Sequence, residues 1–198
     1  MKSYVRRFAF CALTMLVFAG LSLAADIESA KQAYQTKDYG TAYKEASPLA
    51  AQGNAEAELL LGKMYLMGQG VLKDSDEAVK WLKKSAMQGN AEAQFFLGSF
   101  YMLPRRDFAE GVKWMRLSAE QGNKDAQYLL GKAYLQGDKD FPPDPVQAEK
   151  WLLLASQSNL EFYQRELLGA EKQMSTSQIE KGKALAQAWK PKSDLRPE

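Results

Sequence analysis

The pentapeptide Leu-Gly-Lys-Met-Tyr at residues 61–65 occurs, in variant form, three times in this chain of 198 residues. It returns as Leu-Gly-Ser-Phe-Tyr at 97–101 and as Leu-Gly-Lys-Ala-Tyr at 130–134, and an alanine stands four residues before each leucine. Successive copies are 36 and then 33 residues apart. A period of roughly 20 to 50 residues is typical of architectures built from stacked supersecondary units. We therefore expect a repeat protein.

Each repeat is predicted to contain two helices. The marked alanine, leucine, glycine and tyrosine fall on one helical stripe, and the glycine lets a second helix approach closely. An Ala/Gly-x-x-Trp segment follows each copy and supplies Trp81, Trp114 and Trp151. One helix pair cannot bury its own apolar stripe, so we expect stacking to build the core and these tryptophans to fill it. The first helices are expected near 56–67, 92–102 and 125–136, and the second near 75–88, 107–121 and 144–157.

Capping residues mark the predicted helix ends. Asp74 is a candidate N-cap for a second helix, and Glu77 three residues later completes a pattern like a capping box. Gly89-Asn90 and Gly122-Asn123 are expected to end second helices, because both residue types tolerate left-handed backbone geometry.

The repeat resembles the Sel-one-like repeat (SLR) family, which is related to tetratricopeptide repeats. Residues 57–89 carry nearly every position of the family pattern, including the Gly-x-Gly-Val turn at 68–71. Two departures are the absence of that turn in the second repeat and Gly111 where alanine is usual. The resemblance implies an all-α, right-handed α-α solenoid of stacked antiparallel helix pairs. It also implies an N-terminal capping repeat at residues 25–54, followed by full repeats at 55–90, 91–123 and 124–159. C-terminal capping helices at 160–191 and a flexible tail at 192–198 complete the expected organisation.

Residues 1–24 have the features of a secretory signal peptide. Three basic residues precede an apolar stretch from Phe8 to about Leu23, and small residues precede a predicted cleavage site after Ala24. An uncleaved anchor is the alternative, but the stretch falls short of the roughly 20 apolar residues that a spanning helix needs. We expect a periplasmic or secreted protein with no membrane anchor after cleavage.

Composition disfavours nucleic-acid binding and catalysis. Removal of residues 1–24 takes away three of 26 basic residues and none of 24 acidic ones, which leaves a net charge of −1. A near-neutral chain offers little attraction for nucleic acid. The chain has no histidine, and its one cysteine, Cys11, lies in the leader. Common zinc sites and Ser-His or Cys-His pairs are therefore absent, so we expect no cofactor, no metal and no enzyme. The acidic residues between Asp138 and Glu149 have calcium-loop spacing, but Pro142 and Pro143 replace required positions.

Function is predicted to lie on the first helices, which usually line the concave face of a solenoid. The expected positions combine apolar anchors with charged neighbours, which suits a peptide or protein partner in the cell envelope. They are Glu56, Leu59, Lys63, Leu66, Met67, Glu92, Phe95, Ser99, Met102, Asp125, Tyr128, Lys132 and Leu135. The structural alternative is that neighbouring helices cover part of this face. The functional alternatives to a scaffold or adaptor are an immunity or inhibitor protein against a secreted effector, and a cell-wall or β-lactam hydrolase.

Overall fold

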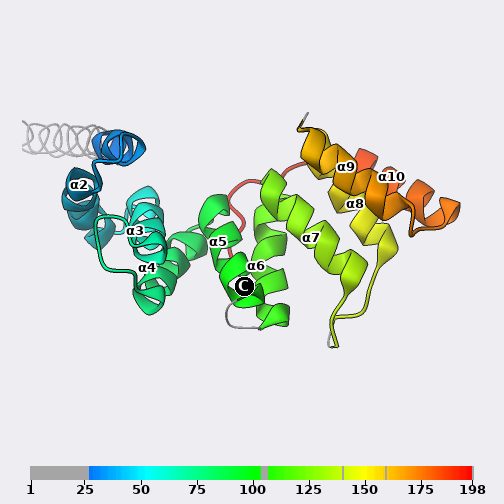
Figure 1. Ribbon diagram of the computed structural model, residues 1–198, viewed down its shortest axis with the longest axis horizontal. Helices are drawn as coiled ribbons and strands as arrows, with labels where there is room; N and C mark the ends of the chain where they lie inside the picture. The colour runs from blue at the N-terminus through cyan, green and yellow to red at the C-terminus, as the bar shows by residue number, and fades with distance from the viewer. Residues whose placement is uncertain (1–26, 104–106, 140, 159, 198) are drawn as a thin grey trace, which may run out of the picture. The chain divides into compact units, whose positions relative to one another are not determined.

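The computed structural model describes residues 27–103, 107–139, 141–158 and 160–197 (Figure 1). The predicted signal peptide lies outside these residues. The chain divides into two compact units, at residues 1–81 and 82–198. Within the described residues every regular element is a helix, apart from one isolated bridge between Asp138 and Phe141.

The first unit contains the capping repeat and the start of the first full repeat. A helix at residues 27–35 is followed by α2 (Tyr39–Ala51) and α3 (Ala55–Met67), and α4 (Ser75–Met87) begins in this unit and continues into the second. Their apolar stripes meet in one core that includes Ala46, Leu61 and Met64, all at most 2% exposed. Trp81 packs against this core while partly exposed. Helix propensity alone would not hold such short helices, so this core stabilises them.

The second unit contains the other repeats and the C-terminal helices. Its helices after α4 are α5 (Ala91–Met102), α6 (Phe108–Glu120), α7 (Lys124–Gln136), α8 (Pro145–Ser156), α9 (Glu161–Glu171) and α10 (Thr176–Ala188). The predicted second and third repeats correspond to the pairs α5/α6 and α7/α8. The six predicted full-repeat helices agree with the structure to within one residue at each end. The predicted all-α class is confirmed.

The glycine of each Leu-Gly pair has the predicted role in the second unit. A methyl group on Gly98 would lie 2.9 Å from the backbone nitrogen of Met115 in α6. One on Gly131 would lie 2.7 Å from Cγ of Leu152 in α8. Gly111 faces Gly98 across the α5–α6 contact, and a side chain there would clash with Met102. The departure from the family alanine at this position thus makes room for Met102.

The Gly-Asn turns differ from the prediction. Gly89 and Gly122 follow second helices with φ angles of +93° and +94°, as a left-handed helix end requires. Asn90 and Asn123, however, have extended backbones and begin the next helices. Their side chains accept hydrogen bonds from the nitrogens of Ala93 and Ala126 at 2.9 Å. The asparagine of each pair is therefore an N-cap, because its short side chain satisfies an otherwise unpaired amide.

The predicted N-cap at Asp74 is confirmed, but the second bond of the capping box is absent. Its carboxylate accepts hydrogen bonds from the backbone nitrogens of Asp76 and Glu77 at 2.9 and 3.0 Å. Glu77 does not return to the cap residue and instead bonds Lys80 at 2.9 Å. A complete capping box occurs at Ser175, where Gln178 and Ser175 bond each other reciprocally at the start of α10.

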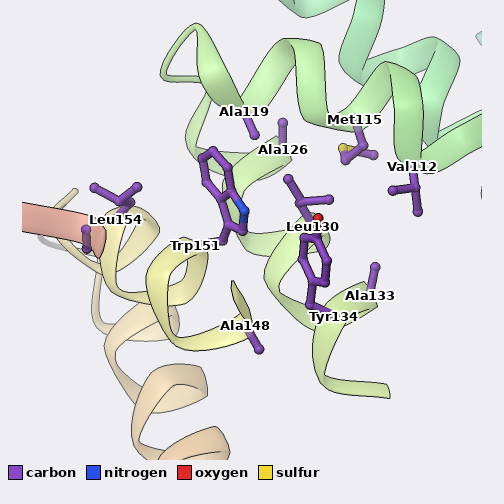
Figure 2. Close-up of a cluster of buried hydrophobic side chains, with 11 residues drawn as sticks. Val112, Met115, Ala119, Ala126, Leu130, Ala133, Tyr134, Ala148, Trp151 and Leu154 are labelled. Atoms are coloured by element: carbon purple, nitrogen blue, oxygen red, sulfur yellow. The ribbon is translucent and has the colours of Figure 1, made fainter. Parts of the chain in front are cut away.

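Trp151 lies at the centre of the core in the second unit (Figure 2). It is 2% exposed and points from α8 toward Ala119, Ala126 and Leu130 on α6 and α7. The Trp189 ring, after α10, meets it edge-on at 6.3 Å between centroids. Trp114 is also buried, at 5% exposure. These placements confirm the core role predicted for Trp114 and Trp151, and large buried rings contribute strongly to the energy of a core.

The C-terminal segment lies against the second unit. The Trp189 indole donates to a Glu120 carboxylate oxygen at 3.1 Å, and the Lys192 backbone nitrogen donates to the Glu120 carbonyl at 2.9 Å. The Gln94 side-chain amide donates to the Leu195 carbonyl at 2.6 Å. Residues 192–195, predicted to belong to a flexible tail, therefore have specific partners on α5 and α6.

Candidate interaction surface

Helix α9 covers the four predicted positions on α7. The Tyr128 hydroxyl and the Lys132 ammonium both donate to Oε2 of Glu166 on α9, at 3.0 and 3.1 Å. Asp125 accepts a hydrogen bond from the Tyr163 hydroxyl. Leu135 packs beside a small cluster that includes Leu152, Leu167 and Ala170. The structural alternative, cover by a neighbouring helix, therefore applies to this part of the predicted face.

The predicted positions on α5 divide into inward and outward residues. Glu92 is exposed, and Phe95 is half-buried with its ring edge-on to Phe96 at 5.4 Å. Ser99 is half-buried, and its hydroxyl has no hydrogen-bond partner in the described part of the molecule. Met102 packs into the core against Gly111. Of these four side chains only Glu92 is exposed, and Phe95, like Met102, packs against the core.

The predicted positions on α3 belong to the first unit. The Lys31 ammonium, from the helix at residues 27–35, contacts Glu56 at 3.0 Å, and the Lys63 ammonium lies 5.5 Å from the centre of the Tyr34 ring. Leu59 is buried at 8% exposure, which removes it from the accessible face. Leu66 is half-buried, and Met67 is 48% exposed.

A residue that the sequence did not single out completes the surface on the second unit. Phe162 on α9 is 53% exposed and meets the Tyr128 ring edge-on at 5.2 Å. The Lys132–Glu166 ion pair lies beside it, with side chains 32% and 28% exposed. We call Tyr128, Lys132, Phe162 and Glu166 the α7–α9 surface. Phe162 could not be placed from the sequence because Leu168-Gly169 of α9 lacks the alanine and tyrosine that complete the motif in the three repeats.

The electrostatics of the α7–α9 surface hold it in one arrangement at neutral pH. Hydrogen bonding from Lys132, and then from Tyr128, holds the pKa of Glu166 below its ordinary value. Burial, and then the bond to Glu166, raises the pKa of Tyr128 to about 12. The carboxylate is therefore charged and the phenol neutral, as the two hydrogen bonds require. The arrangement orients rings and charges but presents no nucleophile paired with a base.

Glu149 is the most perturbed acid of the second unit. It is completely buried on α8, and neither carboxylate oxygen has a hydrogen-bond partner among the described residues. Burial, together with the nearby Glu171, raises the pKa of Glu149 to about 7, while Lys183 opposes the rise. Gly182 on α10 packs directly on the aliphatic part of its side chain. Such a group is enclosed by helices and has no open space in which to meet a substrate.

The described residues contain no group of three or more potential ligands placed to hold a metal ion. Asp144, one of the acids with calcium-loop spacing, instead caps α8 by accepting from the Val146 and Gln147 nitrogens at 3.0 and 3.1 Å. None of the helices in the described ranges is both long and apolar enough to cross a membrane.

Comparison with known families decides the classification. The family model for the Sel1 repeat matches residues 55–90, 91–123 and 124–160, which together exceed half of the chain. The chain belongs to the Sel1 repeat family. The predicted resemblance is thereby confirmed, and the fold of this Sel1 repeat protein generally serves as a scaffold for protein–protein interaction rather than catalysis.

Solved structures agree with this fold. A protective antigen present in uropathogenic Escherichia coli strains, displaying an SLR fold, aligns over 82% of this chain and 38% of its own with a TM-score of 0.72 and 23% identity. A Sel1 repeat protein from Oxalobacter formigenes aligns over 71% of this chain and 59% of its own, with a TM-score of 0.66 and 29% identity. This chain thus spans less than two thirds of either relative. No curated protein matches it.

Proposed function

We propose that this Sel1 repeat protein is exported to the cell envelope and binds a peptide or protein partner there through the α7–α9 surface, without catalysing a reaction. The observation that carries the proposal is Phe162, an aromatic side chain 53% exposed on a folded helix and supported by the Tyr128 ring. Exposed aromatic anchors ringed by charged groups are typical of residues that dominate binding energy at interfaces.

The surroundings of Phe162 favour binding over accidental exposure. The Tyr128 ring meets both Phe162 and Tyr163, at 5.2 and 5.5 Å, and its hydroxyl is fixed by Glu166. These contacts restrict the rings before a partner arrives, which lowers the entropy cost of association. The half-exposed Lys132–Glu166 pair supplies charges of both signs at the rim.

The proposal is tested by placing a photo-crosslinking amino acid at position 162 in the full-length protein, expressed in its native host. Replacement of Phe162 is compatible with folding because more than half of its side chain is exposed. A second probe at Lys113, whose side chain is 73% exposed on α6, is the control. We expect a discrete adduct from position 162 that is absent from position 113. Identical adducts from both positions, or none from 162, would contradict the assignment.

The identity of the adduct also separates the scaffold from its alternative. An envelope protein captured through Phe162 supports an adaptor, whereas a single secreted effector enzyme would instead support an immunity or inhibitor protein. Turnover of peptidoglycan or a β-lactam by the purified protein, abolished by one acid substitution, would overturn the non-catalytic proposal.

Export requires its own measurement. The proposal rests on the basic start, apolar stretch and small residues within residues 1–24. Cell fractionation followed by intact-mass analysis is expected to find the protein outside the cytoplasm with Ala25 at its N-terminus. A cytoplasmic protein that retains Met1 to Ala24 would contradict it.

A further inference from the structure

An open pocket of about 300 Å³ lies between α6, α7 and α8 of the second unit. Its lining includes Arg116 and Glu120 from α6, Tyr134 from α7, and Lys150 and Trp151 from α8. This volume is suited to one side chain or one polypeptide terminus rather than to a large ligand. None of the predicted binding positions lines it, so the pocket is independent of the α7–α9 surface.

Arg116 brings an uncompensated charge to the pocket. One guanidinium nitrogen donates to the Tyr134 hydroxyl at 2.5 Å, and the guanidinium lies 5.9 Å from the centre of the same ring. No carboxylate among the described residues lies within ion-pair distance of it. A guanidinium has five N–H donors, so most of those on Arg116 have no protein acceptor. The Tyr134 oxygen accepts the bond from Arg116, and its own proton therefore remains available for a second acceptor.

Lys150 brings a second cation with unused donors. Its side chain is only 13% exposed, and its ammonium lies 3.8 Å from the centre of the Trp151 ring. The paired carboxylate oxygen of Glu120 is 3.7 Å away, beyond hydrogen-bonding distance. Burial, with added repulsion from Lys192 and Arg116, lowers the pKa of Lys150 despite the attraction of Glu120. The charge of Lys150 is thus incompletely compensated within the described structure.

The two acids of the lining, Glu120 and Asp144, already accept bonds from other groups. One oxygen of Glu120 accepts from the Trp189 indole at 3.1 Å and lies 3.6 Å from the Lys192 ammonium. One carboxylate oxygen of Asp144 caps α8, as described above. The lining thus holds two cations, Arg116 and Lys150, and two carboxylates, Glu120 and Asp144, and both cations keep N–H donors that no acceptor in the described part of the chain uses. The Lys150 ammonium is the donor to which burial applies: its side chain is only 13% exposed and its paired carboxylate lies beyond hydrogen-bonding distance, a cost that an incoming anion would offset.

We propose that this pocket binds a carboxylate group of a partner polypeptide, held by the Arg116 guanidinium, the Lys150 ammonium and the Tyr134 hydroxyl. A planar carboxylate matches the paired donors of a guanidinium, and it can take a further bond from an ammonium on its other oxygen. The carboxylate can come from an aspartate or glutamate side group of the partner or from the partner's C-terminus. The protein would thus contact an acidic group of its partner through a pocket formed largely by its second helices α6 and α8. This contact is separate from the α7–α9 surface.

Isothermal titration calorimetry with the mature full-length protein and four short peptides tests the proposal. One peptide carries a single internal glutamate and an amidated C-terminus, and a second carries glutamine and a free C-terminus. The third carries glutamine and an amidated C-terminus, and the fourth is the third with phosphoserine added. We expect a dissociation constant on the order of millimolar for at least one of the first two, weakened by added salt. The stronger of those two identifies the source of the carboxylate.

Substitutions locate the binding. Arg116→Ala and Lys150→Ala are each expected to weaken carboxylate binding about tenfold or more. Arg116→Lys is expected to weaken it less, because it keeps the charge but loses the paired donors. Lys113→Ala is the matched control, since Lys113 lies on the same helix and pairs with Glu110 at 3.1 Å outside the pocket. Arg116 is exposed, so its variants should fold even if the Lys150 variant does not.

Four results would overturn the proposal. They are equal binding of the neutral peptide, exclusive binding of the phosphoserine peptide, an Arg116→Ala variant that binds carboxylate as the wild type does, and no binding by either carboxylate peptide. Loss of carboxylate binding in Arg116→Ala, with an unchanged circular dichroism spectrum and an unaffected Lys113→Ala control, would support it. Cross-linking at Phe162 is a separate readout, so failure of one proposal is distinguishable from failure of the other.

Discussion

Replacing Glu149 by glutamine is predicted to stabilise the second unit at alkaline pH and to leave its stability nearly unchanged in acid. The wild-type side chain is buried on α8 beneath α10, near Glu171 of α9 and Lys183 of α10. Its ionisation places a charge where neither oxygen has a hydrogen-bond donor among the described residues. Glutamine keeps the shape and removes the charge, and its amide can donate to Glu171.

The magnitude follows from proton linkage. The pKa of Glu149 is about 7 in the folded protein against an ordinary value of 4.5. Each tenfold change in proton affinity corresponds to about 1.4 kcal/mol, so the cost of ionising Glu149 reaches at most roughly 3 kcal/mol. Between these two values the folded state holds a proton that the unfolded state has lost. The contribution of Glu149 to the free energy of unfolding therefore falls as pH rises from about 4.5 to about 7, and is constant above.

Urea denaturation followed by tryptophan fluorescence at pH 4, 5, 6, 7 and 8 measures this effect. At each pH we take the difference between the free energies of unfolding of Glu149→Gln and wild type, which removes the contribution of groups that do not interact with Glu149. It should be near zero at pH 4 and rise to as much as roughly 3 kcal/mol in favour of glutamine at pH 8. Glu180→Gln, an exposed change on α10, is the control and should show no such rise. A difference that does not vary with pH, or a variant destabilised at pH 8, would refute the reasoning.

Three further predictions concern packing, capping and the C-terminal segment. Gly111→Ala should lower the free energy of unfolding, measured in urea, by about 1–3 kcal/mol because its methyl group would clash with Met102. Gly169→Ala, with open space around it, should raise the free energy of unfolding by about 0.5–1 kcal/mol. Asn123→Ala should cost about 1 kcal/mol by removing the cap of α7, measured in the same way, and an unchanged midpoint would argue against the capping role. A stop codon after Ala188 should lower the stability by roughly 2 kcal/mol and red-shift the tryptophan emission by exposing Trp151; a tail without packing contacts would produce neither change.

The sequence predicted those features that depend on local spacing. The Leu-Gly-x-x-Tyr and Ala/Gly-x-x-Trp motifs located six helices, because a motif that recurs in each repeat fixes both the helix face and its partner. The glycine at position 98 was correctly assigned to close packing for the same reason. Asn90 was assigned to the wrong helix, since glycine and asparagine both suit a helix end and only the backbone geometry shows that the next helix begins there.

The surface was less predictable because it depends on how helices without the motif dock. Tyr128 was predicted to lie on the first-helix face, but its bond to Glu166 comes from α9, 38 residues later. Neither Phe162 nor the contact of Leu195 with Gln94 has a local sequence signal. The cation pair at Arg116 and Lys150 likewise arises from two helices whose relative rotation a motif does not specify.

The central claim, that the α7–α9 surface holds the partner, is tested most directly by one affinity measurement. The partner cross-linked at position 162 would be purified, and its dissociation constant measured with wild type, Phe162→Ser and Lys113→Ser. An exposed aromatic anchor at an interface contributes roughly 1–2 kcal/mol or more, so the first variant should bind about tenfold more weakly or worse. The second should bind as wild type does. Equal affinities for all three proteins would contradict the account.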